Sequence, residues 1–148
     1  MIQELLNNKM LISALLAWSL GQAVKIPVHY LIHRKWDWSL LFTTGGMPST
    51  HSAMMSAVTL SIGLHAGFNT AAFAIAFTIT MIVVYDAAGV RRQAGLHAEK
   101  INQLITEIFT SHPISEGTLK EVIGHSPPQV IVGIIFGITI SLLLWVSW

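Results

Sequence analysis

The sequence contains no cysteine and very little charge. Only 10% of its 148 residues are Asp, Glu, Lys or Arg, whereas 53% are hydrophobic. The absence of cysteine excludes disulfide bonds, a thiolate nucleophile and a cysteine-based metal site. An average soluble domain carries roughly 25% charged residues, so the scarcity of charge excludes a disordered chain, a coiled-coil protein and a basic nucleic-acid binder. It also disfavours a soluble globule and favours an integral membrane protein.

The few charged residues leave three long uncharged runs, residues 10–24, 38–85 and 122–148. A helix crosses a bilayer with about 20 apolar residues. We therefore predict four spans, from about Met10 to Val24 with an extension toward Leu31, Ser52 to Gly67, Thr70 to Tyr85 and Val130 to Trp148. A cleavable signal peptide is the alternative for the first run.

The length suits one domain. The predicted fold is all-α: an integral membrane helical bundle of about four to five transmembrane helices plus short interfacial helices. It forms a single membrane-embedded domain over residues 1–148.

The link between the second and third spans, Gly67-Phe68-Asn69, indicates a tight turn. Segments 25–51 and 86–129 therefore emerge on the same side of the membrane. They hold almost every charged group and every histidine except His65. An active site assembled from both segments is topologically possible.

The region after Tyr85 has the pattern of an amphipathic helix. Its apolar face is formed by Leu96, Ile101, Leu104, Ile105 and Ile108. We expect this helix to lie on the membrane surface or over the bundle. We expect it to end at His112-Pro113 and a second short helix to run from about Glu116 to Ile123, stopping at Gly124.

The segment Gly45-Gly46-Met47-Pro48-Ser49-Thr50-His51-Ser52-Ala53 combines a turn with the start of a helix. Two glycines and a proline define the turn, and a Ser or Thr caps the helix. Free backbone N–H groups at a helix N-terminus attract an anion, and His51 can give or take a proton. A capped transmembrane helix with an interfacial histidine is the alternative.

Two further segments carry chemistry. Gly124-His125-Ser126-Pro127-Pro128-Gln129 places a histidine directly before the fourth span, either as a nucleophile or as an ordinary loop residue. In the segment from Tyr85 to His97, Arg91 and Arg92 offer donor forks suited to phosphate, or they anchor the interface. Asp86 is a carboxylate at a span end, where it needs a partner.

These groups, with Lys25 directly after the first span, suit an anionic tetrahedral ligand. The sequence lacks a carboxylate cluster for Mg²⁺ and a Walker-type loop, so we expect no metal and no cofactor. A metal-free phosphoryl transfer through histidine is the simplest chemistry that uses all of these residues.

The motifs resemble those of the type 2 phosphatidic acid phosphatases, relatives of the vanadium haloperoxidases. Pro48-Ser49-Thr50-His51 resembles their Pro-Ser-x-His motif, and the segment from His125 to Val130, followed by Gly133, resembles their final motif. With Gly45-Gly46-Met47 and the segment Asp86 to Arg92, the chain is most similar to the small, divergent branch of that superfamily. The resemblance runs from about Lys25 to Gly137.

The resemblance implies roles for individual residues. His125 attacks phosphorus and forms a phosphohistidine, while His51 protonates the leaving oxygen and then activates water. Cations and the Ser49 backbone or hydroxyl bind the phosphoryl oxygens. The predicted substrate-binding set is Lys25, Ser49, Thr50, Arg91, Arg92 and Gln129.

Three positions depart from the family pattern. Ile32 stands where the first motif has Arg, Leu119 where the final motif has Arg, and Gln129 where an Asp orients the nucleophile. Gln can accept a hydrogen bond from imidazole but cannot stabilise its charge. Asp86, Glu99 or Glu121 is expected to substitute, and we include Asp86 in the catalytic set.

His97 is the alternative nucleophile, because Arg91 and His97 have the family's six-residue spacing. However, Ile101 then stands where Asp is expected, and no span follows directly. We therefore favour His125.

The leading hypothesis is a membrane enzyme that hydrolyses phosphatidylglycerophosphate, phosphatidate or a polyprenyl diphosphate. A small transport or proton-conducting bundle that uses His65, and a catalytically inactive relative, are the alternatives. We expect the bacterial cytoplasmic membrane as the location, with the side of the active site open. We expect a lipid phosphate and no nucleic acid as partner. Four short spans are few for enclosing a site, so a homodimer is a further hypothesis.

Overall fold

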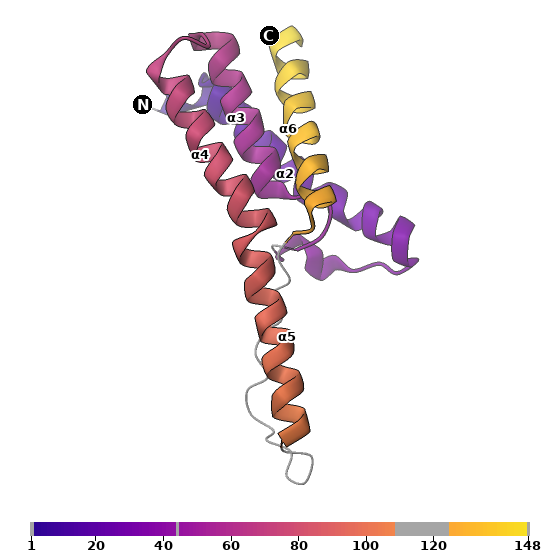
Figure 1. Cartoon of the computed structure of the whole chain (residues 1–148). Coiled ribbons are helices and arrows are strands. Elements are labelled where there is room, and N and C mark those ends of the chain that lie inside the picture. Colours follow the sequence, from indigo (N-terminus) through magenta and orange to yellow (C-terminus); the bar gives the residue numbers. More distant parts are fainter. Residues whose placement is uncertain (1, 44, 109–124, 148) are drawn as a thin grey trace.

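The computed structural model of the chain describes residues 2–43, 45–108 and 125–147 as an all-helical protein (Figure 1). The helices are α1 (Ile2–Leu6), α2 (Lys9–His33), the 3-10 helix η1 (Trp38–Leu41), α3 (Thr50–Ala66), α4 (Ala71–Ala88), α5 (Val90–Ile108) and α6 (Pro127–Ser147). The side chains of residues 2, 91, 92 and 106–108 lie outside this description. So do the expected helix end at His112-Pro113 and the expected short helix at 116–123.

Three of the described helical stretches are long and apolar enough to cross a bilayer: α2, the stretch 71–105 formed by α4 and α5, and α6. The all-α class is confirmed, but there are three candidate spans instead of the predicted four to five. The difference lies in α3, which has 17 residues and buries mainly Ser, Thr, Ala and Gly. A helix of this length measures about 25 Å, less than the roughly 30 Å of a bilayer core.

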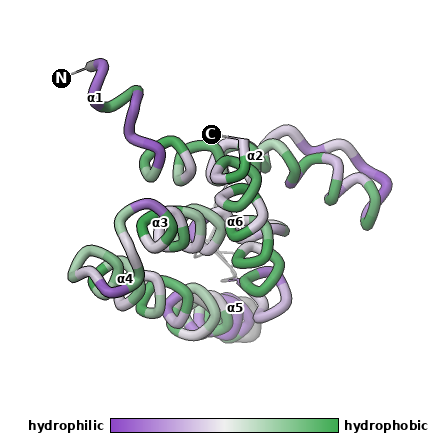
Figure 2. The backbone as a smooth tube through the Cα atoms, turned by 90° about the horizontal axis from the view of Figure 1, so that it is seen from above, coloured by the Kyte–Doolittle hydropathy of each residue, from purple (hydrophilic) through white to green (hydrophobic). Residues whose placement is uncertain are grey.

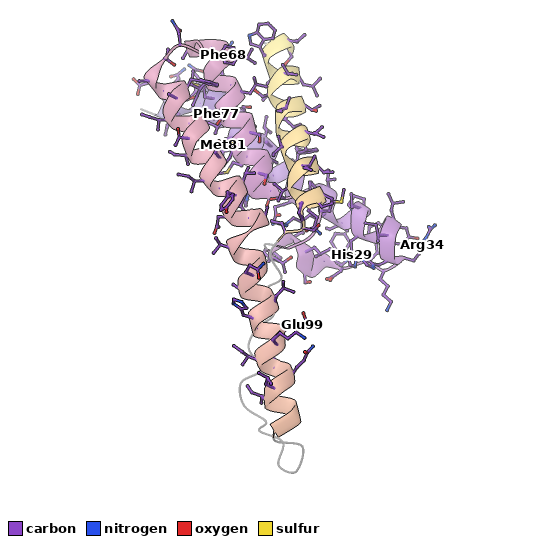
Figure 3. The ribbon with its side chains drawn as sticks, in the orientation of Figure 1. His29, Arg34, Phe68, Phe77, Met81 and Glu99 are labelled. Carbon is purple, nitrogen blue, oxygen red and sulfur yellow. The ribbon has the colours of Figure 1, made fainter. Side chains whose placement is uncertain are left out.

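Helix α2 is longer than the predicted first span. It begins after Asn8, whose side chain accepts a hydrogen bond from the Leu11 N–H, and it ends at Arg34 in a left-handed conformation (φ 57°). The predicted end at Val24 is wrong, and the extension toward Leu31 is confirmed. The charge of Lys25 suggested an end to the span, but the residue is buried inside the helix. The last turns of α2 project away from the bundle, where Figure 3 labels His29 and Arg34.

Helix α3 is the centre of the bundle and packs against α2, α4 and α6 (Figures 1 and 2). Its buried side chains are small: Thr50, Ser52, Ala53, Ser56, Ala57, Thr59, Ser61 and Gly63. Small residues let membrane helices approach closely, and hydroxyl groups bond across the contacts. The Thr59 and Thr80 hydroxyls lie 2.7 Å apart between α3 and α4. A central helix surrounded by protein can therefore be more polar than the helices around it.

Helix α6 meets α3 along glycines. A Cβ atom on Gly133 would collide with the Ser49 carbonyl oxygen, and one on Gly137 would collide with the Ala53 carbonyl oxygen. The two glycines are four residues apart, the spacing that brings membrane helix backbones together. The opposite face of α6 carries exposed apolar side chains, among them Ile131 and Ile135, which suits contact with lipid.

Helix α5 continues the direction of α4 and projects beyond the bundle (Figure 1). Only Gly89 separates the two helices, so the chain has no loop in which to turn. Of the described helices, α5 contacts α4 alone. The predicted amphipathic helix is confirmed by its strong segregation of apolar and polar residues. The expectation that it lies over the bundle is wrong.

The substitution Gly137→Ala should lower the thermal unfolding midpoint, because the new methyl group would force α6 away from the Ala53 backbone. Adding a methyl group to a filled contact costs typically about 1–3 kcal/mol. Circular dichroism of the purified protein in detergent measures the midpoint. Ile135→Ala, on the exposed face of α6, is the control for a general loss of helix stability. An unchanged midpoint for Gly137→Ala would contradict the close contact.

Candidate functional site

Helix α3 begins directly after a tight turn. Gly46 has φ +87°, a conformation that side chains disfavour, and Pro48 and Ser49 follow in buried positions. The Ser49 hydroxyl lies 2.9 Å from the Ser52 hydroxyl and accepts the Ser52 N–H at 3.4 Å. The predicted cap by a Ser or Thr is thus confirmed, with Ser49 in that position, and it sets the backbone from which His51 projects.

The N-terminus of α6 has a cap of its own. The Gln129 Oε1 atom accepts a hydrogen bond from the Ser126 N–H at 2.9 Å, and Pro127 occupies the first helical position. A Ser followed three residues later by Gln is a capping box, in which the long side chain reaches back to the helix start. His125 directly precedes this cap and is 5% exposed. Gln129 was predicted to contact substrate. In the structure, its side-chain Oε1 atom fixes the turn that carries His125.

A backbone hydrogen bond joins the two helix starts. The Ser49 N–H donates to the Gln129 carbonyl oxygen at 3.1 Å. One turn further along α6, Gly133 leaves the space into which the Ser49 carbonyl projects. These two contacts bring the segments of His51 and His125, 74 residues apart in the sequence, to one end of the bundle.

Lys25 lies beside the same turn and is 1% exposed. Its Nζ atom donates to the Thr43 carbonyl oxygen at 3.0 Å, and its side chain runs close to Gly46. Three residues earlier on α2, Gln22 donates to the Leu41 carbonyl oxygen at 2.8 Å. A cation inside a candidate span is costly and is therefore a marker of function.

The remaining predicted residues lie along α4 and α5. Asp86 is in the last turn of α4, which runs antiparallel to α3, so Asp86 lies at the same end of the bundle as the start of α3 (Figure 1). The side chains of Arg91 and Arg92 lie outside the described residues. His97 is exposed on α5, which among the described helices contacts neither α3 nor α6. The fold therefore brings His125 to the α3 start and holds His97 on the projecting helix.

Two of the residues predicted to bind substrate make contacts that hold the helices together or cap them. Ser49 is 0% exposed, with its hydroxyl in the α3 cap, and Thr50 packs against Gly21 of α2. Sequence reasoning missed Gln22, although it lies one turn before Lys25 on the same side of the helix. It also missed the packing role of Gly137, which the spacing of four residues from Gly133 could have indicated.

Comparison with known proteins gives two matches. The sequence model of the Divergent PAP2 family matches residues 6–140. The uncharacterized membrane protein YuiD of Bacillus subtilis (strain 168) is 37% identical over 152 aligned positions, which cover 95% of this chain and 96% of YuiD. No solved structure matches the chain.

Two substitutions of Gln129 should show whether its side chain stabilises the fold by capping α6. Gln129→Ala removes the acceptor for the Ser126 N–H and should destabilise the fold by about 1 kcal/mol, as the loss of a helix cap does. Gln129→Glu keeps an acceptor oxygen, now of a carboxylate, at the same place and should retain the thermal unfolding midpoint. If the Glu variant is destabilised as much as the Ala variant, the side chain does not act as a cap.

Proposed function

We propose, because the chain belongs to the Divergent PAP2 family, that it is a membrane phosphatase that hydrolyses a lipid phosphate or diphosphate ester. Phosphatidylglycerophosphate, phosphatidate and polyprenyl diphosphates are the substrate candidates. The family matches nearly the whole chain, and the membrane location agrees with the candidate spans and with the description of YuiD as a membrane protein.

The hydrogen bond between Ser49 and Gln129 is the observation that carries this proposal. It holds the backbones that present His51 and His125 at a single end of the bundle. A phosphohistidine mechanism needs two histidines beside one phosphorus atom, one as nucleophile and one as proton carrier. The buried Lys25 beside the same turn supplies positive charge for the phosphoryl group.

The proposed reaction has two steps. In the first, an imidazole nitrogen of His125 attacks the terminal phosphorus, the bond to the ester or bridging oxygen breaks, and His51 gives a proton to the leaving group. The leaving group is a lipid alcohol from a phosphate ester and a lipid monophosphate from a diphosphate ester. In the second, His51 takes a proton from water, the resulting hydroxide attacks phosphorus, and the phosphorus–nitrogen bond breaks. Inorganic phosphate leaves, and both histidines return to their starting states.

Donors at the α3 end would stabilise the charge that develops on the phosphoryl oxygens. Lys25 fits this role once its ammonium group exchanges the Thr43 carbonyl for a phosphoryl oxygen. Arg91 and Arg92, at the start of α5, are proposed as further ligands on the sequence pattern alone. Asp86 is the proposed partner that orients a catalytic imidazole.

A transport function is less well supported. It depended on His65 as an ionisable group deep in the membrane, but His65 is exposed in the last turn of α3, with its Nδ1 atom 2.9 Å from the Ser61 carbonyl oxygen. Among the described side chains, Lys25 is the charged one buried within a candidate span, and it lies at the α3 end that carries His51.

The decisive measurement is phosphate release by purified protein in detergent with each of the three lipid classes. His125→Ala should abolish release because no phosphohistidine can form. His51→Ala should reduce it by about 10²–10⁴-fold, the usual contribution of a general acid–base group. With a ³²P-labelled substrate, the native chain should give an acid-labile labelled protein that His125→Ala does not form.

His65→Ala is the matched control, since it removes a histidine at the far end of α3 and should leave release unchanged. Loss of release in His97→Ala together with activity in His125→Ala would reassign the nucleophile to His97. A folded native chain that releases phosphate from none of the lipids would contradict the proposed function and favour an inactive relative.

A further inference from the structure

One face of α5 carries a stripe of residues with regular spacing. The stripe, which we call the α5 seam, consists of Val90, Ala94, His97, Ile101 and Leu104. The intervals are four, three, four and three residues, an average of 3.5, which is the period at which one helix packs along another. All five residues are exposed. The low charge of the whole chain excludes a coiled-coil protein, but it does not exclude such packing along one helix.

A hollow adjoins the first turn of the seam at the junction of α4 and α5. Its volume is about 550 Å³, and its lining is Tyr85, Gly89, Val90, Gln93, Ala94 and His97. The small residues Gly89 and Ala94 leave this space open. Side chains of a second helix therefore have room to enter between those of the seam.

None of the described helices other than α4 contacts α5, so no other described helix packs along the seam. The membrane surface is also a poor partner. The stretch 71–105 includes a candidate span, and α5 continues the direction of α4 away from the bundle (Figure 1). A helix that extends a span points away from the bilayer instead of lying along it.

The charges of α5 agree with this conclusion. Helices that lie on membranes are rich in Lys and Arg on their polar face. Beyond Arg91 and Arg92 in its first turn, α5 has one base, Lys100, and two acids, Glu99 and Glu107. Lys100 and Glu99 both form hydrogen bonds with Gln103. The Lys100 Nζ atom donates to the Gln103 Oε1 atom at 3.1 Å, and the Gln103 Nε2 atom donates to the Glu99 Oε1 atom at 3.4 Å. Figure 3 shows Glu99 on the projecting part of α5.

We propose that the α5 seam binds the same seam of a second copy of this chain, forming a parallel dimer. Two copies inserted in one membrane have the same orientation, so their seams run in the same direction and can meet residue for residue. Confinement to the bilayer raises the effective concentration, which compensates for a contact of fewer than three heptads. His97 is the one polar member of the seam, and a single polar position favours the in-register pairing. The proposal is independent of the phosphatase function.

Single cysteines test the proposal directly, because the chain has no cysteine of its own. Ala94→Cys places a thiol on the seam, where two copies in register bring the Cα atoms within the roughly 7 Å that a disulfide requires. Gln103→Cys is the matched control, since it lies nine residues later and on the opposite side of the helix. Each full-length variant is reconstituted into lipid vesicles, treated with a mild oxidant and run on a non-reducing gel.

The expected result is a band at twice the 16.2 kDa monomer mass for Ala94→Cys, lost on reduction, and monomer alone for Gln103→Cys. Adding Leu104→Glu to Ala94→Cys should reduce the dimer band, because two buried carboxylates would face each other in the seam. Absence of the dimer band in Ala94→Cys overturns the proposal. Equal bands in both single variants, or a band that survives Leu104→Glu at full strength, indicate random collision and overturn it as well.

Discussion

The hydrogen bond from the Ser49 N–H to the Gln129 carbonyl oxygen ties together the starts of α3 and α6. Both helices have side-chain caps of their own, from Ser49 and from Gln129, so each start is also held by contacts within its own helix. The missing Cβ at Gly133 lets the α6 backbone approach the Ser49 carbonyl. A backbone bond in a low-dielectric interior is costly to break, because its donor has no water to replace the partner. The positions of the His51 and His125 backbones follow from this joint.

Close packing of this kind explains why the central helix α3 buries mainly small and hydroxyl-bearing residues. In a bilayer, helices gain little from burying apolar groups against each other, so close backbone contact and hydroxyl bonds must supply the attraction. α3 meets three helices, and its Ser, Thr, Ala and Gly residues serve all three contacts. This packing also surrounds Lys25 with protein, and the Thr43 carbonyl oxygen accepts a hydrogen bond from its Nζ atom, which lipid tails could not do.

Much of the fold could be predicted from the sequence, because apolar helices, their caps and tight turns depend mainly on residues that are neighbours in the sequence. The cap at Ser49 and the turn at residues 67–69 follow from residue type alone. The end of α2 was misplaced because charge marks a span boundary only when it faces water, and Lys25 does not. The direction of α5 was also unpredictable, since periodicity defines a helix face but not whether the chain turns at Gly89 or continues in the direction of α4. The Ser49–Gln129 bond uses backbone atoms, which are the same at every residue, so side-chain patterns could not reveal it.

The packing also sets a condition on the proposed chemistry. The Ser49 hydroxyl is engaged in the α3 cap, and the Thr50 methyl group packs against Gly21, so a ligand at either side chain would compete with these contacts. Lys25 differs, because its nitrogen is bonded to a carbonyl of the segment that follows α2. A phosphoryl oxygen is a charged and therefore stronger acceptor than a carbonyl. Under the proposed function, a substrate would displace Thr43 from Lys25 while the joint between α3 and α6 stays closed. The rigid joint would then keep the histidine backbones in place while the loop before α3 yields to the lipid headgroup.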